Sequence, residues 1–225
     1  MGPRPKRVMI HGLQRSGTNF VQFLLERNFH VQTTPMRAAG KHGPWCAPDP
    51  WERLDAVVVI SKPPYAWMVS LFEQVGLNRR YEGGKTFSDF LRRPCSAPLR
   101  EGPWQAASPA WLYNAAYNNW LAIGRLKWNV AYVRYEDLLD PANIGKELSR
   151  LKFELGLSTE EGSEWVYPHS YMGTTGQQRE GEEEKQRASV ERFQNALSFF
   201  GEDDLPFVNT QLERRVMEGL GYEYA

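Results

Sequence analysis

The chain has 225 residues, of which 41% are hydrophobic and 13% aromatic, and its 27 basic side chains are matched by 27 acidic ones. This length is sufficient for one domain, alone or with a small cap, that buries a substantial core, and we expect a single domain over residues 1–225. Because the charges balance, no global field attracts nucleic acid or an anionic membrane, so we expect neither as a partner, and any anion site has to be built locally.

The two cysteines, Cys46 and Cys95, stand in unrelated sequence contexts. This excludes a disulfide scaffold and a cysteine-based zinc site. The apolar run behind the basic N-terminus covers only residues 8–10, which is too short for a secretory signal or a membrane span. These features predict a cytoplasmic protein.

The first third of the chain predicts a strand, a glycine-rich turn and a helix. The strand covers residues 8–11, the helix about 17–28, and a short extended stretch follows at 30–34. Residues 35–53 are rich in Pro, Gly and Trp, which indicates a long loop. Long loops of this kind often carry function.

The continuous β-branched run "DAVVVIS" at 55–61 is typical of a parallel strand buried on both faces. The next segment, 63–75, predicts a helix with Pro64 in its first turn. A long amphipathic helix is expected within 106–126.

Residues 129–139 predict another buried strand. Residues 140–155 predict a helix that begins at Asp140 and Pro141. Residues 158–181 show no clear period and indicate a mobile loop or lid, after which two helices close the chain. The alternation of strands and helices predicts an α/β fold, a three-layer sandwich with a central, mainly parallel sheet.

The turn after the first strand, within "VMIHGLQRSGTNFVQFLLE", almost matches a Walker A loop. Gly12 and Gly17 have the right spacing, but Thr18 and Asn19 stand where that loop has its lysine and hydroxyl. Such a turn can wrap backbone N–H groups around an anion at a helix N-terminus, and Arg15 adds a forked cation. The alternative interpretation is a surface turn that caps the helix.

A second pattern favours the anion site. Lys62 follows the buried strand, at the same sheet edge as the turn, and Ser70 lies eight residues further on in the next helix. A cation at a strand end with a hydroxyl above it can hold a second phosphate.

The segments "LQRSGTNF", "ISKPPYAWMVS" and "VRYEDLLDP" together resemble the sulfotransferases that use 3′-phosphoadenosine 5′-phosphosulfate (PAPS). The resemblance covers about residues 7–156, and "LGYE" at 220–223 is similar to the usual end of the family. It implies a P-loop-like sulfotransferase architecture with PAPS as donor, 3′-phosphoadenosine 5′-phosphate (PAP) as product and no obligatory metal. The acceptor would be a hydroxyl or amine of a small molecule or glycan.

By position in the family motifs, the resemblance implies a role for each site residue. Arg15 would neutralise the departing bridging oxygen. The 5′-phosphate would be bound by Ser16, Gly17, Thr18 and Asn19, the adenine by Phe20 and Tyr135, and the 3′-phosphate by Lys62 and Ser70. Lys62 replaces the family's arginine, and no clear counterpart of the family's "RKG" segment exists, the nearest candidates being Arg179 and Lys185.

The acceptor has to lose a proton, so a base is needed. "GKHGPW" resembles the family's segment "K-x-H-x-P", which makes His42 the candidate base, against an ordinary solvent-exposed loop histidine. The alternatives are carboxylates such as Glu73 or Asp49. Trp45 and Trp104, in loops, are candidates for lining an acceptor pocket.

Two other functions remain open on the sequence. One is a P-loop kinase-like phosphotransferase, which Thr18 disfavours because it cannot replace the Walker lysine. The other is a non-catalytic nucleotide-binding module that has kept the fold and lost the chemistry.

Overall fold

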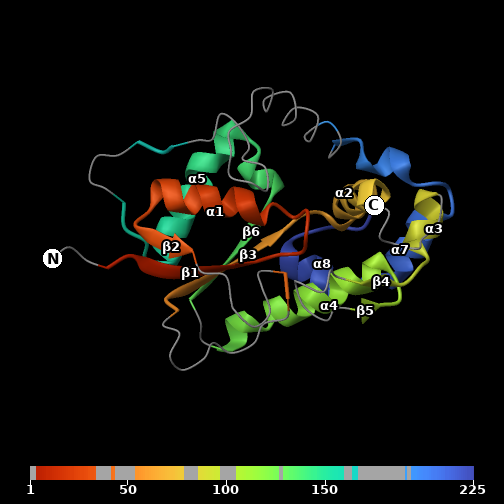
Figure 1. Cartoon of the computed structure of the whole chain (residues 1–225), viewed down its shortest axis with the longest axis horizontal. Helices are drawn as coiled ribbons and strands as arrows, with labels where there is room; N and C mark the ends of the chain where they lie inside the picture. The colour runs from red at the N-terminus through yellow and green to blue at the C-terminus, as the bar shows by residue number, and fades with distance from the viewer. Residues whose placement is uncertain are drawn as a thin grey trace.

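A computed structural model describes residues 4–33, 42–43, 54–78, 86–96, 105–126, 129–159, 164–166, 191 and 194–225. Its centre is a four-stranded, all-parallel sheet flanked by helices, with strand order β2-β1-β3-β6 (Figure 1). The strands are β1 (Lys6–His11), β2 (Val31–Thr33), β3 (Ala56–Ser61) and β6 (Val130–Arg134). The predicted α/β class is confirmed.

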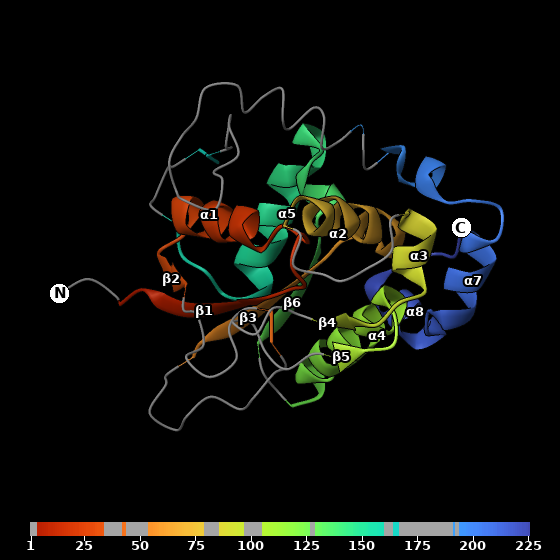
Figure 2. The same cartoon turned by 45° about the vertical axis from the view of Figure 1, so that its right-hand side comes forward.

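The helices lie on both faces of this sheet, with α1 and α5 on one and α4 and α8 on the other (Figures 1 and 2). Their bounds are α1 (Thr18–Asn28), α2 (Pro64–Asn78), α3 (Phe87–Leu91), α4 (Pro109–Leu121), α5 (Pro141–Glu154), α7 (Asp204–Gln211) and α8 (Arg214–Leu220). Short 3-10 turns are η1 (Ile123–Leu126), η2 (Glu136–Leu138) and η3 (Ala196–Phe199). In the closing part of the chain, the described helices are α7 and α8, and the predicted helix start at 180–187 lies outside the described residues.

Strand β3 is buried along its whole length, as the run "DAVVVIS" predicts. Its side chains alternate between two cores because successive residues of a strand face opposite sides. Val58 and Ile60 pack with the apolar faces of α1 and α5. Val57 and Val59 pack with α2, α4 and α8. This double burial fixes the strand between the two helical layers.

The helix starts follow local capping chemistry. The Asp140 side chain accepts a hydrogen bond from the Ala142 N–H at 2.9 Å, and Pro141 opens α5. Ser108 caps α4 by accepting from the Trp111 N–H at 3.3 Å.

The sequence did not predict a small antiparallel pair, β4 (Cys95–Ser96) with β5 (Gln105–Ala106). Cys95 is a buried free thiol, and burial raises its pKa to about 12.

Several predictions lie mostly or wholly outside the described residues. Of the loop at 35–53 only residues 42–43 are described, and of the lid at 158–181 only residues 158–159 and 164–166. The individual residues concerned are Cys46, Trp45, Asp49, Trp104, Arg179 and Lys185. None of the described helices is long and apolar enough to cross a membrane.

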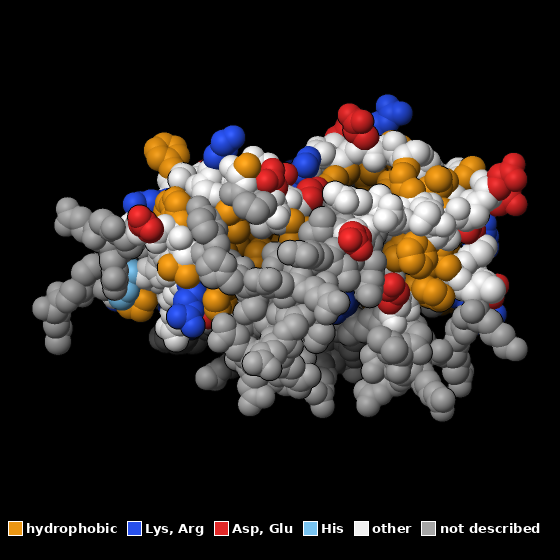
Figure 3. Space-filling view, turned by 90° about the horizontal axis from the view of Figure 1, so that it is seen from above, with side chains coloured by type: hydrophobic (Ala, Val, Ile, Leu, Met, Phe, Trp, Pro, Cys, Tyr) orange, Lys and Arg blue, Asp and Glu red, His pale blue; other side chains and the backbone are white. Residues whose placement is uncertain are grey.

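Acidic and basic side chains are interspersed with apolar ones on the described part of the face seen from above (Figure 3). Neither sign of charge dominates the described surface in this view. A local arrangement is therefore needed to bind an anion strongly.

The turn between β1 and α1 lies tightly against the ends of β3 and β6. Gly17 has φ 95°, in the left-handed region, and a Cβ there would strike the Tyr135 ring. A Cβ on Gly12 would lie 2.8 Å from the Ile60 carbonyl oxygen and 2.7 Å from the Ile60 side chain. Only glycine fits at both positions.

Gly17→Ala should therefore destabilise the protein. A left-handed non-glycine residue costs about 1–2 kcal/mol, and the added methyl group also displaces Tyr135. We expect a loss of about 2 kcal/mol or more, which for this chain length lowers Tm by about 4 °C or more. Thermal unfolding measures the shift. The control is Gly145→Ala inside α5, which should raise Tm because alanine is the better helix former; equal Tm values for the two variants would contradict the packing described.

Candidate anion-binding site

The candidate site lies where the order of the strands reverses. Strand β2 lies on one side of β1 and β3 on the other, so the carboxyl ends of β1 and β3 flank a topological switch point. Ligands of open α/β sheets bind at this position. The 12–17 turn follows β1, Lys62 follows β3 and Tyr135 follows β6. The structure thus brings the three sequence motifs to one edge.

The 12–17 turn is held in shape by left-handed residues and by its own hydrogen bonds. Arg15 (φ 69°) and Gly17 (φ 95°) are both left-handed, and the Ser16 N–H and hydroxyl both donate to the Leu13 carbonyl, at 3.1 Å and 2.5 Å. Ser16 itself is fully buried, so its hydroxyl supports the turn from inside.

Helix α1 begins directly after the turn, at Thr18. Its N-cap, Gly17, has no side chain that could accept from the first N–H groups, and the first turn contains no acidic residue. The positive end of the helix dipole is therefore not offset by a carboxylate of its own first turn, which favours a bound anion there.

Two cations meet at this edge. The Arg15 Nε donates to the Ser70 hydroxyl at 3.3 Å, which joins the turn to α2. Lys62 is only 6% exposed. Burial and, next, the Arg15 charge lower the Lys62 pKa, Glu73 and Glu136 raise it, and the net result is a pKa of about 8. The two cations therefore repel each other across the site.

The Lys62 ammonium also lies 5.4 Å from the centre of the Tyr135 ring, a cation–π contact. The resemblance implied the departing bridging oxygen as the partner of Arg15 and the 3′-phosphate as that of Ser70, whereas the structure joins the two side chains in one hydrogen bond. Arg15, Lys62 and Ser70 thus form one cluster, built from the ends of β1 and β3 and the first turns of α2.

The aromatic residues at the site are mostly internal. Phe20 packs edge-on against Tyr135, with ring centres 6.1 Å apart, and belongs to the core between α1 and the sheet. Phe20 therefore presents little surface to an adenine. Tyr135 lies beneath Gly17 and Lys62, at the boundary between the core and the site.

His42 is buried against the start of the turn. Its Nδ1 lies 2.5 Å from the Gly12 carbonyl oxygen, and its ring is 6% exposed. A carbonyl only accepts, so Nδ1 carries the hydrogen and Nε2 of the neutral ring holds the lone pair. The next residue, Gly43, accepts from the Trp120 indole at 3.1 Å. The interpretation of His42 as a solvent-exposed loop histidine is wrong.

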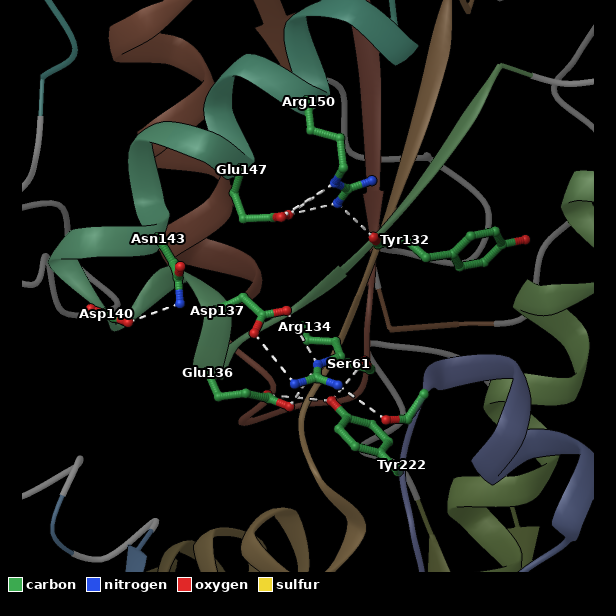
Figure 4. Close-up of polar contacts among 11 residues, drawn as sticks. Ser61, Tyr132, Arg134, Glu136, Asp137, Asp140, Asn143, Glu147, Arg150 and Tyr222 are labelled. Carbon is green, nitrogen blue, oxygen red and sulfur yellow. Dashed lines mark hydrogen bonds and ion pairs between the residues drawn. The ribbon is translucent and has the colours of Figure 1, made fainter.

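A network behind the cations was not predicted from the sequence. Tyr222, after α8, has its hydroxyl 2.9 Å from the Ser61 hydroxyl and donates to Glu136 at 3.4 Å (Figure 4). Arg134 forms an ion pair with the other Glu136 oxygen at 3.1 Å. Burial raises the Glu136 pKa to about 7. The signals available in sequence were "VRYED" at a strand end and "LGYE" near the C-terminus, but neither indicates that the two segments meet.

No model of a known protein family and no curated protein matches the chain. Within the described residues, no group of three or more His, Cys, Asp and Glu side chains is arranged to hold a metal ion.

Lys62→Met should make the protein more stable at pH 7. The folded-state pKa of Lys62, about 8, lies below its ordinary value of 10.5, so the charged form opposes folding. The penalty is complete below about pH 8 and is relieved as the pH rises toward 10.5. We expect a gain on the order of 1–3 kcal/mol at neutral pH.

Denaturant unfolding near neutral pH and at about pH 10 measures this gain, which should shrink at the higher pH. Lys146→Met, at an exposed position of α5, is the matched control and should show no such pH dependence. A Lys62→Met variant no more stable than wild type at neutral pH would show that the buried charge carries no penalty.

Proposed function

We propose that this protein is a sulfotransferase that transfers the sulfuryl group of PAPS to a hydroxyl or amine of a small-molecule or glycan acceptor. The observation that carries the proposal is the joining of Arg15, Lys62 and Ser70 beside a left-handed turn at the N-terminus of α1. The Lys62 ammonium is buried and the Arg15 side chain is exposed, and an anion bound between the two cations would offset their repulsion.

The turn supports a phosphosulfate in preference to a triphosphate with magnesium. Thr18 and Asn19 stand where a Walker loop has the lysine and the metal-binding hydroxyl, so the groups that handle a triphosphate are missing from the turn. The cation lies two residues before Gly17, at Arg15, as in the sulfotransferases that the sequence resembles. A kinase-like phosphotransferase is correspondingly disfavoured.

In the proposed reaction, the acceptor oxygen attacks sulfur in line with the bond from sulfur to the bridging oxygen. That bond breaks, PAP leaves, and the acceptor proton passes to a base. Arg15 would stabilise the negative charge that develops on the bridging oxygen, since preorganised cations at such oxygens lower the barrier of group transfer. Backbone N–H groups of residues 17–19 would hold the 5′-phosphate, Ser16 would support the turn through its bonds to Leu13, and Lys62 with Ser70 would hold the 3′-phosphate.

His42 is the proposed base. The hydrogen bond from its Nδ1 to the Gly12 carbonyl sets the tautomer in which Nε2 of the neutral ring carries the lone pair, the form that base catalysis needs. The same bond ties His42 to the turn that would hold the donor. Glu73 remains the alternative base within the described residues. The proposal includes a single domain and a cytoplasmic location.

The nucleotide preference tests the proposal. PAP should raise Tm without magnesium, and more than AMP does, because AMP lacks the 3′-phosphate that Lys62 and Ser70 would bind. At about one hundred times its dissociation constant a ligand adds ~2.7 kcal/mol of stability. A thermal-shift panel of PAP, PAPS, AMP and ATP, each with and without magnesium, measures this.

Equal increases in Tm with PAP and AMP would contradict the proposed 3′-phosphate site. Stabilisation by ATP that requires magnesium would favour the kinase-like function. Strong PAP binding without turnover of PAPS on any acceptor would favour a non-catalytic nucleotide-binding module.

His42→Asn should lower kcat by ~10²-fold or more and leave PAP affinity nearly unchanged, because a base acts in the transition state and not on the bound donor. Asparagine keeps a donor for the Gly12 carbonyl. Donor turnover and calorimetric PAP titration together measure the effect. His30→Asn, at an exposed position before β2, is the control and should retain wild-type kcat; wild-type turnover in His42→Asn would transfer the role to a carboxylate.

A further inference from the structure

The chain after α8 returns to the candidate site. Gly221 ends the helix in a left-handed conformation (φ 72°), which directs Tyr222 toward the sheet. The Tyr222 hydroxyl lies 2.9 Å from the Ser61 hydroxyl and donates to Glu136 Oε2 at 3.4 Å. Figure 4 shows the ring between the last residue of β3 and the η2 turn.

Arg134 forms an ion pair with the second carboxylate oxygen of Glu136. Its Nε lies 3.1 Å from Glu136 Oε1, and its NH1 donates to the Gly221 carbonyl at 3.0 Å. The guanidinium also lies over the Tyr222 ring, 5.5 Å from its centre. Each Glu136 oxygen therefore has its own partner, and the C-terminal segment is bound to both.

This network is continuous with Lys62. Ser61 immediately precedes Lys62 and pairs with Arg134 in the sheet register. The Tyr135 N–H donates to the Ser61 carbonyl at 2.8 Å, and the Tyr135 ring faces the Lys62 ammonium. Glu136 is therefore the next residue in the chain after Tyr135, whose ring lies against Lys62.

We propose that Glu136, held by Tyr222 and Arg134, is a positioning residue that sustains the ammonium charge of Lys62 for the bound anion. This inference rests on the proposed function only in taking Lys62 as an anion ligand. It assigns the C-terminal segment a part in the site, through Tyr222.

The groups that face Lys62 come from four elements. Arg15, after β1, opposes its charge; Glu73 on α2 and Glu136 after β6 favour it; and Tyr113 on α4 donates to its backbone carbonyl at 2.8 Å. Because burial and Arg15 both lower the Lys62 pKa, the two carboxylates are what keep it as high as about 8.

Glu136 is itself sensitive to pH. Burial and the Asp137 charge raise its pKa, Arg134 and the Tyr222 hydroxyl lower it, and the net result is a pKa of about 7. Three tyrosine side chains interact electrostatically with Glu136, namely Tyr113, Tyr117 and Tyr222. All three stay neutral because burial raises the pKa of each. Glu136 is therefore charged above about pH 7 and Lys62 below about pH 8, so their attraction acts mainly between these values.

The test is PAP affinity as a function of pH, measured by calorimetry from about pH 6 to about pH 9.5. Wild-type affinity should fall as the pH passes about 8, where Lys62 loses its proton. Glu136→Gln should begin that fall about half a pH unit or more earlier and match wild type within about threefold at about pH 6, where Glu136 is already protonated. The phosphates of PAP titrate alike in both titrations, so the comparison isolates the protein.

Glu147→Gln is the matched control, because it removes a carboxylate of the ion pair with Arg150 on α5 and should leave the profile unchanged. If Glu136→Gln fails to fold, Tyr222→Phe replaces it: the ring stays over Arg134, the hydroxyl is lost, and the shift should be smaller in the same direction. A loss of affinity that is equal at every pH would indicate a merely structural role and overturn the inference, as would an unchanged profile. Absence of PAP binding by wild type overturns the proposed function together with the inference, whereas an unchanged profile with normal wild-type binding overturns the inference alone.

Discussion

The close approach of the 12–17 turn to the ends of β3 and β6 is the constraint on which the candidate site depends. Gly12 leaves no room for a Cβ against Ile60, and Gly17 leaves none against Tyr135. This contact brings the first turn of α1 and the two cations to the same edge of the sheet. A larger residue at either glycine would lift the turn and separate Arg15 from Lys62.

The same contact makes the site unfavourable for stability. It holds the buried Lys62 ammonium near the Arg15 guanidinium. Among the described residues, the charges that offset this repulsion are the carboxylates of Glu73 and Glu136. Natural sites tolerate such strain where function needs it. An anion would relieve the repulsion on binding, which links ligand affinity and folding stability through one residue, Lys62. The Arg134–Glu136–Tyr222 network connects the C-terminal segment to one of the carboxylates near Lys62.

Much of the fold could be predicted because its signals are local. The buried run at 55–61, the Asp140–Pro141 helix start and the glycine-rich turn each indicate their own structure, and each is found. The antiparallel pair β4–β5 escaped because two-residue strands have no detectable period. The parallel register that sets Ser61 beside Arg134 was also beyond local reasoning, since it depends on packing between distant segments.

The candidate site was predictable in its residues but less so in its contacts. Arg15, Lys62 and Ser70 were expected at one edge, yet the direct Arg15–Ser70 hydrogen bond depends on the left-handed backbone of Arg15, which is not a residue that usually adopts it. Phe20 is buried because it lies on the sheet-facing side of α1. The helical period of the apolar residues predicts this burial, whereas the family motif assigns Phe20 to the adenine. The meeting of Tyr222 with Glu136 joins residues 86 positions apart in the chain, and no motif encodes that distance.

A crystal structure of the protein with PAP would show whether this sheet edge binds the nucleotide, because it locates both phosphates in one measurement. We predict the 5′-phosphate against the backbone N–H groups of residues 17–19, at the N-terminus of α1, and the 3′-phosphate between Lys62 and Ser70. The Arg15–Ser70 hydrogen bond should be replaced by contacts of both side chains with the ligand. A nucleotide bound away from the carboxyl ends of β1 and β3, or with its 3′-phosphate in solvent, would contradict the account.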